Sequence, residues 1–317
     1  MLRASFRFQT STGYYNCVAL LTSGDCLDQV DGGSMVGQLL DTLSASSVAV
    51  YGVAVLDNEL YVARDRSNVI HVFDASAPLT SPSSCRRRLA VTSRDLPQQV
   101  RPLDVAACAE TRSLYVSDAA NGRVHRVDAA TGRLVASWRV DSRAWGVSVT
   151  AGGTVLVCCR GAALLCEYTS SGQLVRQVRL PDDVAQPVHA VEVRSLYVVS
   201  HYDVEAEATG ARVCLVDVSG AVRRDHGRLS QPHHLAVVVD HASSPGSSPM
   251  IAVADCGNDR VKLLDAATLS ELGVVDGVRR PHRLCVRDGR LYVGQWDGRV
   301  LVFQLSPGLS PAAAVYQ

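Results

Sequence analysis

The sequence predicts an all-β fold, a single β-propeller of six blades, and three observations support this prediction. Valine supplies 48 of the 317 residues, and β-branched side chains favour strands over helices. One phrase of short apolar strands recurs six times, at intervals of 42 to 52 residues, which is typical of propeller blades. Almost no segment shows the apolar spacing of an amphipathic helix.

Each repeat opens with a strand that we expect to lie innermost in its blade. The six openings are 51–55, 102–106, 145–149, 187–191, 232–237 and 281–286. A proline begins four of them, which a strand tolerates at its first residue. When the openings are aligned, the equivalent residues are Gly52, Asp104, Gly146, His189, His234 and Arg283.

Two further strands follow in every repeat, separated by a polar turn. The second strands are predicted at 60–62, 114–116, 155–157, 196–198, 251–253 and 291–293. The third strands are predicted at 69–73, 123–127, 164–168, 212–216, 260–264 and 299–303. A fourth, outer strand is clearest at 132–138 and 172–178, where a glycine begins each one and forms the tight turn.

The last repeat has only three strands, so closure of the ring needs a strand from elsewhere. Segment 37–43 has the pattern of a fourth strand, and we predict that it pairs with 300–303 and removes the exposed edge. Closure by 312–316 is the alternative. The chain then divides into an N-terminal extension, a propeller and a C-terminal tail, at 1–36, 37–305 and 306–317. The Ser/Pro-rich insertions at 75–82 and 242–249 are expected on the face opposite the strand openings, and to be mobile.

The two best-preserved repeats are 114–124, which reads LYVSDAANGRV, and 251–261, which reads IAVADCGNDRV. Together with openings of the Pro-x-x-Leu-Ala-Val type, they resemble NHL repeats, the blades of six-bladed propellers, over residues 37–305. The third repeat departs from the pattern, with Cys159 and Ala162 in place of the Asp and Asn of the turn. The resemblance implies that four side chains hold their turns together: Asp118, Asn121, Asp255 and Asn258.

Composition excludes several classes of function. The 31 basic and 31 acidic side chains balance, which argues against a globally basic nucleic-acid binder. No apolar run approaches the roughly 18 residues of a membrane span. The ten cysteines form no C-x-x-C pair and mostly lie in apolar runs, which predicts reduced thiols in a cytoplasmic protein. There is no Gly-rich phosphate loop and no G-x-S-x-G elbow. We expect a monomer.

Candidate binding residues gather at the entries to the innermost strands, which in propellers share a face with the turns between second and third strands. The residues expected on this rim are Tyr51, Asp104, Trp145, His189, His233, His234, His282 and Arg283. Neighbouring arginines add positive charge: Arg64, Arg66, Arg101, Arg143, Arg160, Arg279 and Arg280. Aromatic groups beside arginine suit stacking on bases or gripping a peptide. Tyr51, Trp145, His233 and Arg283 are the expected anchors.

We therefore expect a non-catalytic recognition module that binds a protein or RNA partner through this face, with no cofactor and no metal. The resemblance to the C-terminal propeller of TRIM-type ubiquitin ligases implies substrate recognition for ubiquitin ligation. The alternative is a zinc- or calcium-dependent lyase or lactonase with its site at the central channel, since six-bladed relatives include such enzymes.

The histidines separate these two readings. The Pro–His pairs that end at His233 and His282 match the positions of the metal histidines in the zinc lyases, and His189 is a conceivable third ligand. We expect His189, His234 and His282 to bond water or backbone instead of zinc, and to titrate near 6.5.

Overall fold

The chain divides into two compact units, residues 1–32 and 33–317. The computed structural model describes residues 4–10, 13–19, 37–43, 48–80, 85–92, 99–184, 186–201, 211–239 and 249–305. In the first unit, β1 (Ala4–Thr10) and β2 (Gly13–Ala19) pair as an antiparallel hairpin, with Phe8 opposite Tyr15. The sequence pattern gave no indication of this hairpin. The rest of the 1–36 extension up to Val36, and the 306–317 tail, lie outside the described residues.

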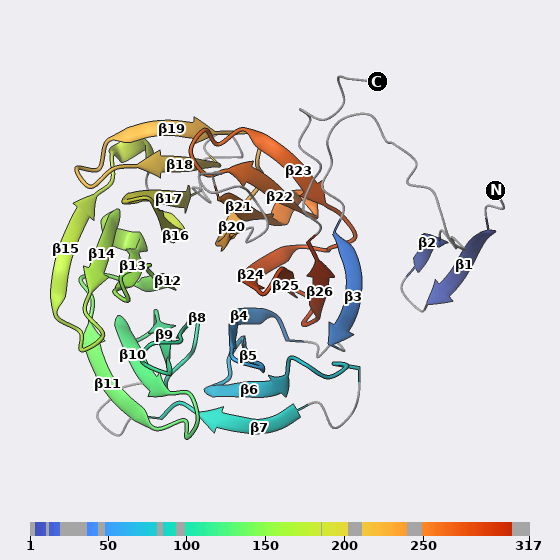
Figure 1. Ribbon diagram of the computed structural model, residues 1–317, viewed down its shortest axis with the longest axis horizontal. Coiled ribbons are helices and arrows are strands. Elements are labelled where there is room, and N and C mark those ends of the chain that lie inside the picture. The colour runs from blue at the N-terminus through green and yellow to red at the C-terminus, as the bar shows by residue number, and fades with distance from the viewer. Residues whose placement is uncertain are drawn as a thin grey trace. The chain divides into compact units, whose positions relative to one another are not determined.

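The second unit is the propeller, with six antiparallel sheets of four strands (Figure 1). Blade 1 contains β4 (Val50–Leu56), β5 (Glu59–Arg64), β6 (Val69–Asp74) and β7 (Cys85–Ala90). Blade 2 contains β8 (Asp104–Cys108), β9 (Ser113–Asp118), β10 (Arg123–Asp128) and β11 (Leu134–Arg139). Blade 3 contains β12 (Ala144–Val149), β13 (Val155–Cys159), β14 (Leu164–Tyr168) and β15 (Leu174–Arg179). Blade 4 contains β16 (Pro187–Val193), β17 (Leu196–His201), β18 (Arg212–Val216) and β19 (Val222–His226). Blade 5 contains β20 (Pro232–Val238), β21 (Met250–Asp255), β22 (Arg260–Asp265) and β23 (Glu271–Val275). Blade 6 contains β24 (Pro281–Arg287), β25 (Arg290–Gln295), β26 (Val300–Gln304) and β3 (Gln38–Leu43).

The first strand of each blade lies at the centre, and each of these strands contacts the first strand of the next blade, with β24 returning to β4. This arrangement confirms the predicted six-bladed propeller. Helical structure in the described part of the chain amounts to three 3₁₀ turns, η1 (Arg160–Ala162), η2 (Asp182–Val184) and η3 (Cys256–Asn258). No helix there is long and apolar enough to cross a membrane.

The strands are apolar on both faces because each blade packs between two others. In β5, Leu60 and Val62 pack toward blade 6, whereas Tyr61 and Ala63 pack toward blade 2. This follows from the two-residue period of a strand. Six such hydrophobic clusters fill the six interfaces between neighbouring blades. The Val-rich composition is therefore what a ring of sandwiched sheets requires.

The ring closes through β3, as predicted. This strand pairs antiparallel with β26, so that Leu43 lies opposite Val300 and Asp41 opposite Val302. Leu43 is buried at the interface with blade 1. The alternative closing segment, 312–316, lies outside the described residues.

The first Ser/Pro-rich insertion differs from its prediction over residues 75–80. Leu79 is 3% exposed and packs with Leu43 and Tyr292 at the interface between blades 6 and 1. Its backbone N–H donates to Asp41 Oδ2 of the closing strand. The insertion was expected to be mobile, but an apolar side chain and one backbone donor fasten it over the point of closure. Residues 81–84 and 240–248 lie outside the described residues.

The acidic turns behave as the repeat pattern implied. Asp118 accepts hydrogen bonds from Asn121 N and Nδ2, at 3.2 and 2.6 Å. Asp255 accepts from Asn258 Nδ2 at 2.9 Å and from Ser230 N at 2.7 Å. Both carboxylates are fully buried, so each one serves its turn and is not presented to a ligand.

Candidate functional site

One position of the repeat brings six residues to the centre of the propeller. These are the residues equivalent in the aligned openings, and four of them carry polar side chains: Asp104, His189, His234 and Arg283. In blades 1, 3, 4, 5 and 6, the pairing of the first and second strands shifts register just where the first strand begins. Such bulges re-aim side chains and are common beside functional sites.

Glycine occupies the equivalent position in blades 1 and 3. A Cβ on Gly146 would collide with the carbonyl oxygen of Val188, and one on Gly52 would lie 2.8 Å from Val105 Cγ2. The innermost strands therefore approach each other too closely at these points for any side chain. Blades 2, 4, 5 and 6 supply all the chemistry of this layer.

Asp104 is the anionic group of the centre and is completely buried. Its Oδ1 accepts from Val105 N at 3.0 Å and lies 3.3 Å from Arg283 Nε. Its Oδ2 accepts from Val147 N at 3.0 Å. Burial alone would raise the pKa of Asp104, but the interactions with His234 and Arg283 outweigh it and lower the pKa to about 2.

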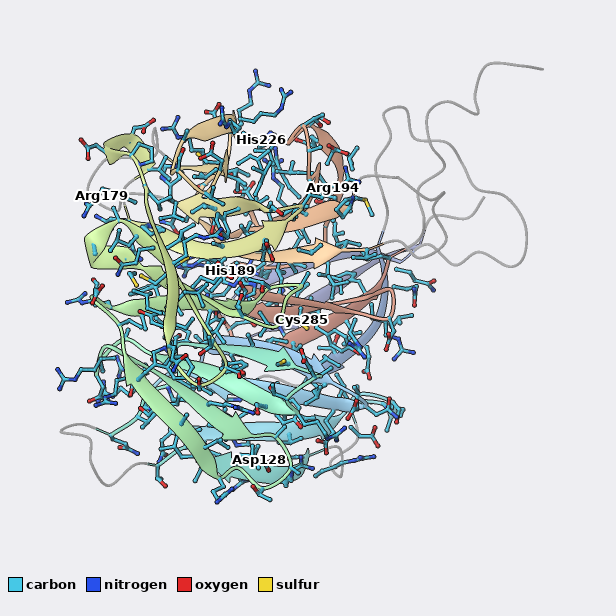
Figure 2. The ribbon with its side chains drawn as sticks, turned by 60° about the vertical axis from the view of Figure 1, so that its left-hand side comes forward. Asp128, Arg179, His189, Arg194, His226 and Cys285 are labelled. Carbon is cyan, nitrogen blue, oxygen red and sulfur yellow. The ribbon has the colours of Figure 1, made fainter. Side chains whose placement is uncertain are left out.

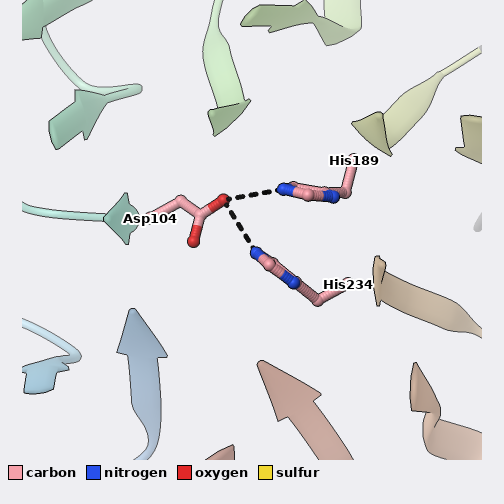
Figure 3. Close-up of side chains that lie close together, drawn as sticks. All are labelled: Asp104, His189 and His234. Carbon is pink, nitrogen blue, oxygen red and sulfur yellow. Dashed lines mark ion pairs between the residues drawn. The ribbon is translucent and has the colours of Figure 1, made fainter. Parts of the chain in front are cut away.

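Two imidazoles face the same carboxylate oxygen (Figure 3). His189 Nε2 lies 3.6 Å, and His234 Nε2 3.4 Å, from Asp104 Oδ2. The two rings are stacked, with centroids 3.6 Å apart. His189 Nδ1 accepts the N–H of Leu235 at 3.3 Å, so its Nε2 carries the ring proton and points toward Asp104 and the carbonyl of Val147. Figure 2 shows His189 in the interior, whereas Arg179 and Arg194 lie on the exposed surface.

The other two histidines expected on the rim, His233 and His282, form a second pair nearby. His233 and His282 have ring centroids 4.2 Å apart, and His282 Nδ1 donates to the carbonyl of Val50 at 3.0 Å. Burial lowers the pKa of His189, His233 and His282 well below 6.5. The expectation that His189 and His282 titrate near 6.5 is therefore wrong, because a buried site disfavours the charged imidazolium.

Arg283 does not present its charge on the surface, although it was an expected anchor. Only 2% of it is exposed. Its guanidinium donates to three backbone carbonyls, those of Tyr51 at 2.8 Å, His282 at 2.9 Å and Leu103 at 3.0 Å. This side chain joins the openings of blades 6, 1 and 2. His233 is also buried, so two of the four expected anchors lie below the surface.

The other two expected anchors, Tyr51 and Trp145, are half-buried at the rim. We call this the top face, meaning the openings of the first strands and the turns between second and third strands. Backbone bonds join the two kinds of loop, from Arg160 N to the carbonyl of Arg143 and from Trp296 N to that of Arg280.

Two arginine–tryptophan pairs lie on the top face. The guanidinium carbon of Arg160 lies 4.5 Å from the ring centroid of Trp145, and that of Arg280 lies 4.9 Å from Trp296. Trp296 is 38% exposed and also contacts Tyr51, with ring centroids 5.9 Å apart. Trp296 was not among the residues predicted for this face. The signal for it was its place in the turn between the second and third strands of blade 6, which the same reasoning assigned to the top face.

Asp104, His189 and His234 are the described residues whose ligand atoms are grouped closely enough to hold a metal ion, all within 4.8 Å of one another. This set shares only His189 with the metal histidines suggested from the sequence, which were His189, His233 and His282. His282 faces a backbone carbonyl, and Asp104 and His234 stand in the set instead of His233 and His282.

Comparisons with known proteins show the fold and nothing finer. No protein-family model matches the sequence, and no curated protein matches it. Virginiamycin B lyase from Staphylococcus aureus is similar in structure, with a TM-score of 0.57 and 12% identity over 84% of this chain and 99% of that one. A catalytically inactive histidine-to-alanine variant of that enzyme, with quinupristin, gives 0.58 and 11% over 85% and 99%. Hydrazine synthase from Kuenenia stuttgartiensis gives 0.59 and 13% over 83% and 97%.

Proposed function

We propose that this propeller is a non-catalytic recognition module that binds a segment of a partner protein across its top face. The observation that carries the proposal is the presence of the two arginine–tryptophan pairs, Arg160 with Trp145 and Arg280 with Trp296. Tryptophan and arginine are the residues most enriched at the energetic centres of protein interfaces.

The pairs lie on opposite sides of the ring, since blades 3 and 6 face each other in a six-bladed propeller. The positive charges of both guanidiniums nevertheless affect the same residue near the centre of the ring, His233. Among the influences that lower the pKa of His233, burial is the largest, and the charges of Arg160 and Arg280 both contribute. A ligand that crosses the mouth of the channel would therefore meet one pair on each side.

Asp104 and Arg283 at the centre are held by hydrogen bonds to backbone groups, which favours binding over catalysis. Asp104 accepts bonds from two backbone amides, and Arg283 donates to three backbone carbonyls. Burial lowers the pKa of His189, His233 and His282 well below 6.5. A general acid or base works best with a pKa near the operating pH, so these three imidazoles are poorly matched to proton transfer at neutral pH.

The charge pattern of the top face favours a protein ligand over a nucleic acid. Exposed acids stand among its arginines: Asp141, Asp182, Asp183, Asp259 and Asp297. A phosphate backbone requires a surface of one sign, whereas protein interfaces match charges of both signs. RNA is accordingly the second partner class to test.

The blade sequences narrow the partner further. We infer that the blades are of the NHL type, because the turns at Asp118 and Asp255 are held as that family's pattern implies. On this inference the partner class includes substrates of a TRIM-type ubiquitin ligase in the cytoplasm.

The experiment is selection from a display library of random peptides, with the propeller as bait. Selected peptides should bind wild-type protein and lose about 30-fold in affinity, equivalent to about 2 kcal/mol, in Trp145→Ala or Trp296→Ala. Arg179→Ala is the matched control, because Arg179 is exposed on the outer strand of blade 3. Equal binding to a folded Trp145→Ala/Trp296→Ala double variant would refute the proposal. Steeply salt-dependent binding of random RNA, with no peptide selected, would move RNA to first place.

An enzyme at the centre is the second candidate, and the metal-binding geometry of Asp104, His189 and His234 favours it. In virginiamycin B lyase, a single histidine-to-alanine change gives an inactive protein. Incubation of the metal-loaded propeller with quinupristin, followed by mass spectrometry, tests this candidate directly. Conversion that His234→Ala abolishes would place the enzyme first.

A further inference from the structure

The carboxylate of Asp104 and the imidazoles of His189 and His234 converge on one point at the centre of the propeller (Figure 3). We propose that these three side chains bind a divalent first-row transition-metal ion, with Zn²⁺ as the reference ion. This goes beyond the proposed recognition function, because the ligands lie in the buried centre and not among the arginine–tryptophan pairs of the top face.

The spacing of the ligand atoms fits an ion. Asp104 Oδ2 lies 3.6 Å from His189 Nε2 and 3.4 Å from His234 Nε2. With metal–ligand distances of about 2.1 Å, tetrahedral geometry places neighbouring ligand atoms about 3.4 Å apart. A direct charge-assisted hydrogen bond would bring the same atoms to about 2.7–2.9 Å. The observed separations match ligands arranged around an ion.

The donor set also selects the class of metal. Two imidazoles and one carboxylate form a set found in zinc sites and in non-haem iron(II) sites, both of which keep further positions open. All three residues are at least nine-tenths buried, which is where a preorganised set of ligands is held most rigidly.

His234 supplies an independent observation. Within the described part of the chain, both of its ring nitrogens are buried and neither makes a hydrogen bond of normal geometry, with Nε2 at ion-pair distance, 3.4 Å, from Asp104 Oδ2. A buried polar group in this state calls for an explanation such as a bound water or ion. A metal ion at Nε2 gives that nitrogen its partner.

The surroundings of Asp104 hold the carboxylate in the orientation that a metal ligand needs. Val105 N and Arg283 Nε engage Oδ1, which turns Oδ2 toward the two histidines. Hydrogen bonds of this kind to ligating carboxylates are a regular feature of metal sites. At His189, a metal ion can bind Nε2 only if the ring proton moves from Nε2 to Nδ1. The hydrogen bond that Nδ1 accepts from Leu235 N at 3.3 Å is then lost, and the bond between Nε2 and the metal replaces it.

The three ligands come from blades 2, 4 and 5, so a bound ion would cross-link half of the ring. An ion that binds the folded state and not the unfolded chain raises the melting temperature. This consequence can be measured without any assay of activity.

The test uses the full 317-residue chain without a histidine tag, stripped of metal by a chelator and titrated with Zn²⁺ by calorimetry and with Co²⁺ by visible absorption. We expect one equivalent of either ion, the intense absorption bands of low-coordinate Co²⁺, and a higher melting temperature. His234→Ala and Asp104→Asn should abolish all three results. His71→Ala, which removes a half-buried histidine of blade 1 away from the cluster, should change none of them.

Failure of the folded wild-type protein to bind either ion would overturn the proposal. So would binding that persists in both His234→Ala and Asp104→Asn. If those variants do not fold, X-ray absorption of the zinc-loaded wild-type protein decides the question, since two imidazoles and one carboxylate support the site and any other donor set refutes it. Peptide selection on the top face reports separately on the recognition function, so the two proposals can fail independently.

Discussion

Arg283 of blade 6 and Asp104 of blade 2 meet at the centre of the propeller, with Nε 3.3 Å from Oδ1, although blade 1 stands between their two blades. Both side chains are buried, and Arg283 also bonds the carbonyls of Tyr51 and Leu103. One guanidinium thus joins the openings of three consecutive blades across the point where the ring closes.

Removing this guanidinium should destabilise the fold severely. Arg283→Met leaves the buried carboxylate of Asp104 without its guanidinium partner. Breaking a buried ion pair in this way typically costs about 3–5 kcal/mol. Urea denaturation followed by circular dichroism measures the loss. Arg66→Met is the control, because 84% of the Arg66 side chain is exposed and its loss should change the free energy of unfolding by less than about 0.5 kcal/mol. A loss at Arg283 as small as that at Arg66 would show that the pair contributes little.

The propeller should lose stability as the pH falls from 7 to 5. The pKa values of His189, His233 and His282 are well below 6.5 in the folded state, so below that pH the unfolded chain binds more protons than the native one. The loss of free energy of unfolding from each such histidine begins near pH 7, and its slope approaches about 1.4 kcal/mol per pH unit once the pH is well below 6.5. Asp104, whose pKa is about 2 when folded and 3.8 otherwise, adds a further loss only below about pH 4.

Urea denaturation at pH 7, 6 and 5 measures this dependence. His282→Gln should flatten the curve, because glutamine does not titrate. A free energy of unfolding that stays constant between pH 7 and 5 would contradict the burial of neutral imidazoles at the centre.

Closure of the ring should depend on β3 and on the insertion that covers it. Deletion of residues 1–43 removes the strand that pairs with β26 and should lower the melting temperature by about 10 °C or more, since 1 kcal/mol corresponds to about 2–4 °C for a chain of this size. Deletion of residues 1–36 keeps β3 and should have little effect. Differential scanning fluorimetry distinguishes the two outcomes, and equal melting of both truncations would place the closure elsewhere.

Leu79→Ala probes the same closure from the side of blade 1. Leu79 is buried against Leu43 and Tyr292, so the substitution should cost about 3 kcal/mol. Thr80→Ala is the matched control on the exposed neighbouring residue. An unchanged unfolding midpoint in Leu79→Ala would show that the insertion does not fasten the ring.

Amine-directed modification should leave the folded propeller untouched. Lys262 is the only lysine among the 31 basic side chains, and its Nζ lies 2.6 Å from Glu271 Oε2 with 4% of the side chain exposed. An N-hydroxysuccinimide ester should therefore fail to label the peptide that contains Lys262 in native protein and should label it in urea. Arg66→Lys provides a positive control at an exposed site. Labelling of Lys262 as fast as that of residue 66 in this variant would contradict its burial.

The amino-acid sequence by itself determined the strands of the propeller, the number of blades and the closure of the ring. The six openings recur at nearly constant spacing, and both faces of strands such as 60–63 are apolar, which only a sheet packed between two others requires. The pattern of 37–43 was enough to predict its pairing with β26, because in each of the five other repeats a fourth strand follows the third. The alignment also placed Asp104, His189, His234 and Arg283 at one equivalent position, and so near a common axis.

Only the tertiary structure decided what these residues do there. The first strands that carry His189, His234 and His282 each shift register where they begin, and the first two of these histidines face Asp104 of blade 2. His282 faces the carbonyl of Val50 instead. Burial then lowers the pKa of His189, His233 and His282, and Arg283, expected on the surface, is enclosed by backbone carbonyls. Trp296 reaches the top face beside Tyr51 because blades 6 and 1 become neighbours when the ring closes. Strand periodicity is a local property that a sequence records, whereas the convergence of side chains from separate blades depends on contacts that exist only in the closed ring.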